Sequence, residues 1–173
     1  MTQTISAQDG RRYEIAQLHS SVFIHASCLE RQGADSSVSE SKSYESPEGY
    51  YYTKDHEWIK ITGSTVLVGI TDYAAKMLND IVYVNLPQPG AIQKKKDVFG
   101  QVESVKTVSD MYMPLSGKVL KINSNLAQTP ELVSNSPYSE GWMMEVAPSD
   151  LEREKKELLD SKAYKEYIET LKE

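Results

Sequence analysis

One lysine stands out as a side chain that could carry chemistry: Lys106, within GQVESVKTVSDMYMPLSGKV at positions 100–119. The neutral amine of lysine is a nucleophile towards activated acyl groups, so a modifying enzyme that reaches it can acylate it. Apolar residues such as Val102 before it and Met111 after it predict two short strands. The sequence therefore predicts an accessible amine at the tip of a β-hairpin, although most lysines on such turns carry no modification.

Two acidic residues flank this lysine, Glu103 three positions before it and Asp110 four positions after it. Across a hairpin, both carboxylates could lie near Lys106 and be recognised by the enzyme that modifies it. Exposed charges also keep turns soluble, and this explains the same residues equally well. Recognition and solubility remain two open interpretations of Glu103 and Asp110.

The remaining reactive side chains predict no catalytic or metal site. Cys28 is the only cysteine, so the chain can form neither an internal disulfide nor a cysteine zinc site. Any dithiol chemistry must therefore come from an attached group. His19, His25 and His56 are scattered along the chain. The adjacent pair His56–Glu57 resembles an acid–base pair, but a surface or capping role explains it more simply.

Charge and hydropathy exclude two classes of partner. The formal net charge is −6, whereas binding to nucleic acid phosphates requires a basic field. The apolar run 22–24 is far shorter than the roughly 20 residues that cross a bilayer. We therefore expect a chain that binds protein partners, with no nucleic acid and no membrane among its targets.

The N-terminal part, 1–48, differs in composition from the rest of the chain. Its arginines and many serines allow an organellar presequence, although Asp9 and Glu14 weaken that interpretation. Residues 34–49, ADSSVSESKSYESPEG, are a linker by composition. We expect 1–48 to be a disordered extension or mitochondrial transit peptide followed by the Ser-rich linker, and 49–173 to be the folded domain.

The folded part is predicted to be mainly β. Apolar and polar residues alternate over 50–70 around a turn at Gly63, which predicts a β-hairpin. Asp72 is expected to cap a short helix after this hairpin. Many short strands separated by turn residues indicate a β-sandwich or barrel-like core. Further strands are expected over 81–87, 119–122 and 142–148, with helices over about 149–173, the second of them capped by Ser161.

From about Tyr51 onward, the chain resembles the H protein of the glycine cleavage system. The matches keep their order and spacing, and ESVK followed by SD and then P-x-SG is the most specific signal. The matching segments are YTKDHEWIK (52–60), VGITDYA (68–74), DIVYVNLPQPG (80–90), ESVKTVSDMYMPLSGKV (103–119) and PELVSNSPYSEGW (130–142).

This resemblance implies a barrel-sandwich hybrid fold of the lipoyl-domain type and a non-catalytic carrier with lipoate in amide linkage to Lys106. The group would accept the aminomethyl fragment of glycine from a pyridoxal-phosphate glycine decarboxylase and present it to a tetrahydrofolate-dependent aminomethyltransferase. A dihydrolipoyl dehydrogenase would reoxidise the dithiol, and lipoylating enzymes would attach the group. In a eukaryote the resemblance implies the mitochondrial matrix or a related organelle, and in a bacterium the cytoplasm.

Three functions remain open at this point. The first is the glycine cleavage carrier. The second is a lipoate or octanoate relay protein that passes the group on Lys106 to 2-oxoacid dehydrogenase complexes, and the third is an unmodified binding module. One departure from the family pattern lies after the short helix, where Asn79 stands in a segment that commonly carries glycine.

Overall fold

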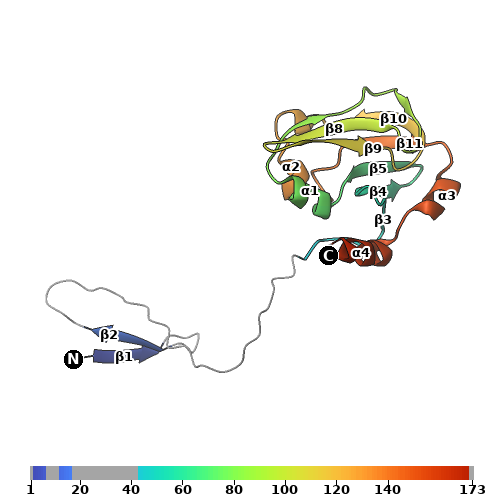
Figure 1. Cartoon of the computed structure of the whole chain (residues 1–173). Helices are drawn as coiled ribbons and strands as arrows, with labels where there is room; N and C mark the ends of the chain where they lie inside the picture. Colours follow the sequence, from blue (N-terminus) through green and yellow to red (C-terminus); the bar gives the residue numbers. More distant parts are fainter. Residues whose placement is uncertain (1, 7–11, 17–42, 172–173) are drawn as a thin grey trace. The chain divides into compact units, whose positions relative to one another are not determined.

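The computed structural model describes residues 2–6, 12–16 and 43–171. The chain divides into two units, Met1–Ser41 and Lys42–Glu173. Within the first unit, β1 (Thr2–Ser6) and β2 (Arg12–Ala16) pair as an antiparallel hairpin (Figure 1). Cys28 and most of the predicted presequence and linker lie outside the described residues, so their predicted disorder and processing stay predictions.

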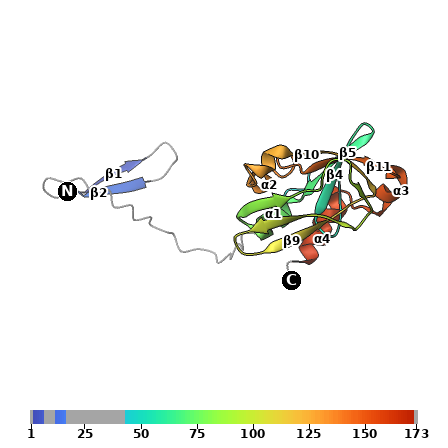
Figure 2. The same cartoon turned by 90° about the horizontal axis from the view of Figure 1, so that it is seen from above.

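The second unit contains two antiparallel sheets. The larger sheet has six strands in the order β3-β4-β5-β11-β10-β7, and the smaller has three in the order β6-β8-β9. Both figures place the helices α1 and α2 at one end of these sheets and α3 at the opposite end (Figures 1 and 2). The strands are β3 (Tyr50–Tyr52), β4 (Glu57–Thr62), β5 (Thr65–Ile70), β6 (Ile81–Asn85), β7 (Ile92–Gln93), β8 (Val98–Ser104), β9 (Val108–Tyr112), β10 (Gly117–Ile122) and β11 (Met144–Pro148).

The main core is aliphatic and draws on both sheets. Successive side chains of a strand point to opposite faces, so each strand contributes alternate residues to the interior. In β10, for example, Val119 is buried while Lys118 and Leu120 on either side of it are exposed. Its fully buried members include Val102 of β8 in the small sheet. Those from β4, β5, β10, β11 and the segments next to these strands include Ile59, Val66, Val68, Met113, Leu115, Val119, Met143, Met144 and Val146.

A second core is aromatic and lies under the C-terminal helix α4 (Ser161–Thr170). The rings of Tyr52 and Tyr164 stack at a centroid distance of 4.6 Å, and neither residue has exposed surface. Trp58 packs edge-on against Tyr50 at 5.2 Å. Since aromatic side chains bury large areas, this cluster anchors α4 to the sheet.

The segment before the first strand of the domain packs on its surface. The Glu45 N–H donates to the Asp72 carboxylate at 2.8 Å, and the Tyr52 hydroxyl donates to the Pro47 carbonyl at 2.7 Å. Composition cannot reveal these contacts, because the serines here resemble those of a linker. Residues 43–48 therefore belong to the folded unit, and the predicted domain start at 49 is too late.

Two of the predicted helix caps lie one residue too far along the chain. The side chain of Thr71, not Asp72, accepts a hydrogen bond from the Ala74 N–H at 3.3 Å and caps α1 (Asp72–Leu78). Asp160, not Ser161, accepts from the Ala163 N–H and caps α4. In both cases the capping residue has an extended backbone, which a residue already inside the helix lacks.

Other helical segments are shorter or less regular than the sequence suggests. The predicted helix over 151–160 is α3 (Leu151–Glu154) followed by a 3-10 turn, η2 (Lys155–Glu157). The segment between β10 and β11 contains a 3-10 turn, η1 (Ser124–Ala127), and a short helix, α2 (Leu132–Asn135). Such single turns leave too few residues for a helical period to be recognised.

His56 joins the aromatic cluster to the cap of α1. Its Nδ1 lies 2.8 Å from the Tyr164 hydroxyl, which lies 2.8 Å from the Thr71 hydroxyl. The ring also packs against Tyr73 with centroids 4.7 Å apart. His56 therefore has a structural role, as the simpler interpretation of the His56–Glu57 pair expects.

The contribution of His56 to the free energy of unfolding is expected to fall on acidification because burial lowers the pKa of His56 below 6.5. The unfolded chain then binds a proton at a higher pH than the folded chain does. The stabilising contribution of His56 is therefore fully present above pH 6.5 and is lost as the pH falls towards the folded pKa, by at most about 1.4 kcal/mol per pH unit.

Urea unfolding between pH 5 and 7 measures this contribution. His56→Asn, which tolerates the positive φ of 74° at this position, should remove that part of the slope, and an equal slope in both proteins would contradict the prediction.

Candidate functional site

Lys106 lies in the tight turn between β8 and β9, where the sequence places it. The last paired residues of the two strands are Glu103 and Val108, so Lys106 projects beyond the ladder. Its side chain is exposed, and among the described residues none forms an ion pair with its ammonium group. The geometry thus offers an amine that an acylating enzyme can approach without displacing a partner.

Ser104 organises this turn. Its hydroxyl accepts hydrogen bonds from the Lys106 N–H at 3.3 Å and the Thr107 N–H at 3.2 Å. The Ser104 N–H in turn donates to the Thr107 carbonyl at 2.8 Å. Ser104 is 8% exposed, so these bonds are shielded from water. The sequence prediction assigned Ser104 no role, although a serine two residues before a turn amide is a recognised local signal.

Glu103 and Asp110 lie on the same outer face of the small sheet. Gln101 stands directly opposite Asp110 and donates to its carboxylate at 2.8 Å, and Glu103 is two positions further along the same strand. Neither carboxylate forms an ion pair with Lys106 within the described part of the chain. Both are placed where an approaching protein could contact them, and their recognition role stays a prediction.

Exposed apolar side chains surround the lysine turn. Val105 is 71% exposed, and Val108 and Tyr83 lie on either side of Glu103 across the three strands. Exposed valine and tyrosine beside a reactive amine are typical of a protein-binding surface. These apolar side chains form an exposed rim next to Lys106, on the surface that a protein approaching this amine would meet.

Glu57 supports the lysine hairpin from below. Its carboxylate accepts a hydrogen bond from the Tyr112 N–H of β9 at 2.9 Å and another from the Thr53 hydroxyl. The side chain is 1% exposed, and burial raises its pKa above the usual 4.5. The sequence predicts a surface or capping role for the His56–Glu57 pair. For Glu57 that is wrong, because β9 covers it.

Close backbone approaches hold the strands around the hairpin. A Cβ on Gly100 of β8 would lie 2.2 Å from the Asn85 carbonyl oxygen of β6. A Cβ on Gly117 would lie 2.4 Å from the Ala147 carbonyl oxygen of β11. Larger residues would force these strands apart, so glycine is required here by packing.

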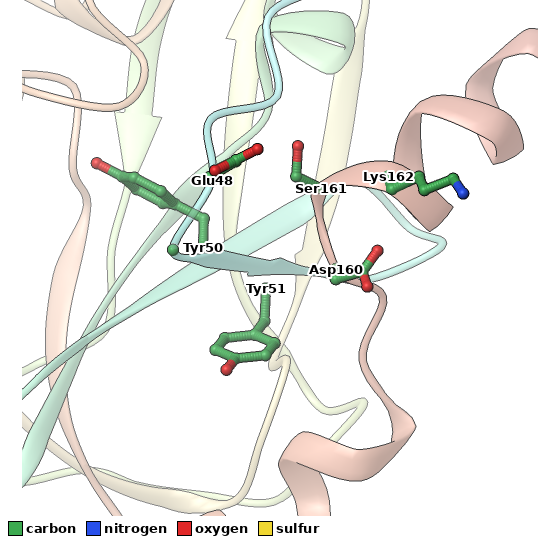
Figure 3. A pocket seen from close by; sticks show the side chains of 7 residues that line it. Glu48, Tyr50, Tyr51, Asp160, Ser161 and Lys162 are labelled. Carbon is green, nitrogen blue, oxygen red and sulfur yellow. The ribbon is translucent and has the colours of Figure 1, made fainter.

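A cavity of about 240 Å³ lies between β3 and the start of α4 (Figure 3). Tyr50 and Tyr51 point to opposite sides of the strand, and the cavity also carries Glu48, Asp160 and Lys162 (Figure 3). Charged groups of both signs line it, and Lys106 is not among its lining residues. It offers no place for the chemistry of the lysine turn.

The described residues offer neither a metal site nor a membrane-spanning helix. These residues contain no group of three or more His, Cys, Asp or Glu side chains arranged to hold a metal ion. They also contain no helix that is both long enough and apolar enough to cross a membrane.

Two antiparallel sheets that present Lys106 exposed on a tight hairpin have the geometry that a carrier domain requires. Comparison with known proteins agrees: the family described as "Glycine cleavage H-protein" matches residues 50–171. The chain belongs to this family, whose members are non-catalytic lipoate carriers.

The relatives support this membership along most of the chain. A probable glycine cleavage system H protein of Pyrococcus furiosus is 52% identical over 129 residues, which cover 74% of this chain and 96% of that protein. The H protein of Thermus thermophilus is 48% identical over 124 residues, covering 72% and 96%. The crystal structure of an H protein from Mycobacterium marinum matches with a TM-score of 0.63 and 36% identity, covering 73% of this chain and 99% of that one. The predicted fold class is thereby confirmed.

Proposed function

We propose that Lys106 carries a lipoyl group in amide linkage and that the chain is the aminomethyl carrier of the glycine cleavage system. The observation that carries this proposal is the exposed amine on a turn fixed by Ser104 in a chain of this family. The residues fit the group, because the amine has open access and no ion-pair partner among the described residues. When attached, lipoate supplies the dithiolane that the chain lacks.

The residues of this chain hold Lys106, and the group proposed on it, in a fixed position. Ser104 fixes the turn, Glu57 and the close strand contacts fix the hairpin, and the apolar rim around Val105 gives partner enzymes a surface to bind. A turn that is already ordered loses little conformational entropy when an enzyme closes on it. Attachment to one mobile side chain also raises the local concentration of the carried group at each partner.

The partners proposed are glycine decarboxylase, the aminomethyltransferase, dihydrolipoyl dehydrogenase and the lipoylating enzymes. Glu103 and Asp110 are proposed as recognition residues for the lipoylating enzyme, since they share the exposed face next to Lys106. The glycine cleavage role is preferred to a lipoate relay because the relatives above are named as glycine cleavage proteins.

The relatives reported above come from archaea and bacteria. They give no support to a mitochondrial matrix location or a transit peptide, and we therefore propose the cytoplasm of a prokaryote. The N-terminal extension keeps no proposed function.

Protein purified from cells with active lipoylation is expected to be heavier than its sequence by one lipoyl group. Peptide mapping should place that group on Lys106, because this amine is exposed on an ordered turn. Intact-mass and fragment-mass spectrometry measure both points. An unmodified Lys106 in such cells would refute the proposed attachment and with it the carrier function.

A further inference from the structure

We propose that Asn79 is a positioning residue for the lysine turn, acting through the backbone of Asp80. This inference rests on the proposed function, because the turn matters only if enzymes act on Lys106. Asn79 follows α1 at the end of the molecule where α1 and α2 lie side by side (Figures 1 and 2). Asn79 is far from Lys106 in sequence. It acts on the turn through its neighbour Asp80, whose carbonyl accepts a hydrogen bond from the Val105 N–H.

The lysine turn has only one amide bonded outside its own hairpin. The N–H groups of Ser104, Lys106 and Thr107 all bond within residues 104–107. The Val105 N–H, immediately before Lys106, donates to the Asp80 carbonyl at 3.1 Å. This bond extends the pairing of β6 with β8 by one step beyond Ile81 and Ser104, so the direction of the Asp80 carbonyl contributes to how the residue before Lys106 is held.

The backbone of Asn79 sets that direction. Its φ of 61° and ψ of −130° lie in a region that glycine adopts readily and other residues rarely. The Asn79 N–H donates to the Ala75 carbonyl at 3.0 Å and closes α1, and its side-chain amide donates to the Asp80 carboxylate at 2.8 Å. From the other side, the Ser134 hydroxyl of α2 donates to the Asn79 carbonyl at 3.4 Å.

These contacts explain how asparagine can adopt a backbone conformation that glycine adopts more readily. Asparagine is among the non-glycine residues that best tolerate positive φ, and its amide adds the bond to Asp80. A β-branched residue tolerates this backbone poorly, so it should turn the Asp80 carbonyl away from Val105. The turn would then lose the last backbone bond beyond the Ile81–Ser104 pair of β6 and β8.

Asn79→Val and Asn79→Gly test the role, with Asn85→Val on the neighbouring strand as control. In Asn79→Val, amide hydrogen exchange at Val105 is expected to rise about tenfold, because a lost hydrogen bond opens that amide. Exchange at Val102 inside β8 should change little. Asn79→Gly, which keeps the backbone conformation available, and Asn85→Val, an exposed strand position, should leave Val105 within about twofold of the wild type.

Acylation of Lys106 by a purified lipoylating enzyme gives the second readout. In Asn79→Val the KM for the carrier is expected to rise about threefold to tenfold, with kcat unchanged, because the enzyme must order the turn as it binds. The Asn79→Gly variant should have the KM of the wild type. Unchanged Val105 exchange, or an unchanged KM despite faster exchange, would overturn the positioning role. Failure to acylate any of the proteins would instead sink the proposed function, while the exchange pattern would still decide the role of Asn79.

Discussion

Lys106→Arg is expected to abolish lipoyl attachment and carrier activity completely. The guanidinium group stays protonated and offers no nucleophilic amine for the acyl transfer. The fold should persist, because the side chain is exposed and the turn is held by Ser104 and by backbone bonds. The free energy of unfolding should stay within about 0.5 kcal/mol of the wild type.

Intact mass measures attachment, glycine-dependent turnover of the reconstituted system measures activity, and urea unfolding measures stability. Lys94→Arg is the matched control, since Lys94 is another exposed lysine in a turn, between β7 and β8. It should remain fully lipoylated and active. Glycine turnover that survives in Lys106→Arg would show that another residue carries the group.

Glu57→Ala is expected to give the largest loss of stability. It leaves the part-buried Tyr112 N–H and Thr53 hydroxyl without their acceptor and opens space at the buried Glu57 position. Each unsatisfied buried donor costs about 1–3 kcal/mol, so we expect a loss of roughly 3 kcal/mol and a fall in Tm of roughly 10 °C. Denaturant unfolding and calorimetry measure both, with the exposed Glu140→Ala as a control expected to be neutral.

Glu57→Gln separates the charge from the hydrogen bonds. The amide oxygen can still accept from Tyr112, so the loss should be near 1 kcal/mol. Because burial raises the pKa of Glu57, the folded protein binds a proton at a higher pH than the unfolded chain. The stabilising effect of this group is thus full at acid pH and declines as the pH rises above about 4.5. The advantage of the wild type over Glu57→Gln should shrink across that range, and a constant or growing advantage would contradict the raised pKa.

Local patterns were sufficient for the elements that carry the lysine. The strands on either side of Lys106, the hairpin around Gly63 and the helix after Thr71 follow from alternation, turn residues and capping, all of which act over a few neighbours. The family itself was recognisable from motifs such as ESVK and SD around Lys106, because they are contiguous in the chain.

Contacts between residues far apart in the sequence could not be predicted from these local patterns. Glu57 meets Tyr112 across 55 positions of sequence. No periodicity in either segment indicates that β9 covers this carboxylate, and the polar pair His56–Glu57 suggests a surface instead. In the same way, the serines before Tyr50 predict a linker. In the structure, the hydroxyls of Tyr52 and Tyr138 donate to backbone carbonyls of this segment and hold it on the domain.

The sequence by itself determined which residue offers the amine and that a hairpin presents it, since both depend on neighbours along the chain. Only the tertiary structure decided how firmly that hairpin is held. Glu57 bonds the backbone of β9, and the Asp80 carbonyl, directed by the positive φ of Asn79, bonds the turn itself. The Glu57 bond joins segments that meet only when the two sheets pack together, and the Asp80 bond continues the pairing of β6 with β8 within the small sheet. Neither partner is a close neighbour in the chain, so no local pattern of residues encodes these bonds.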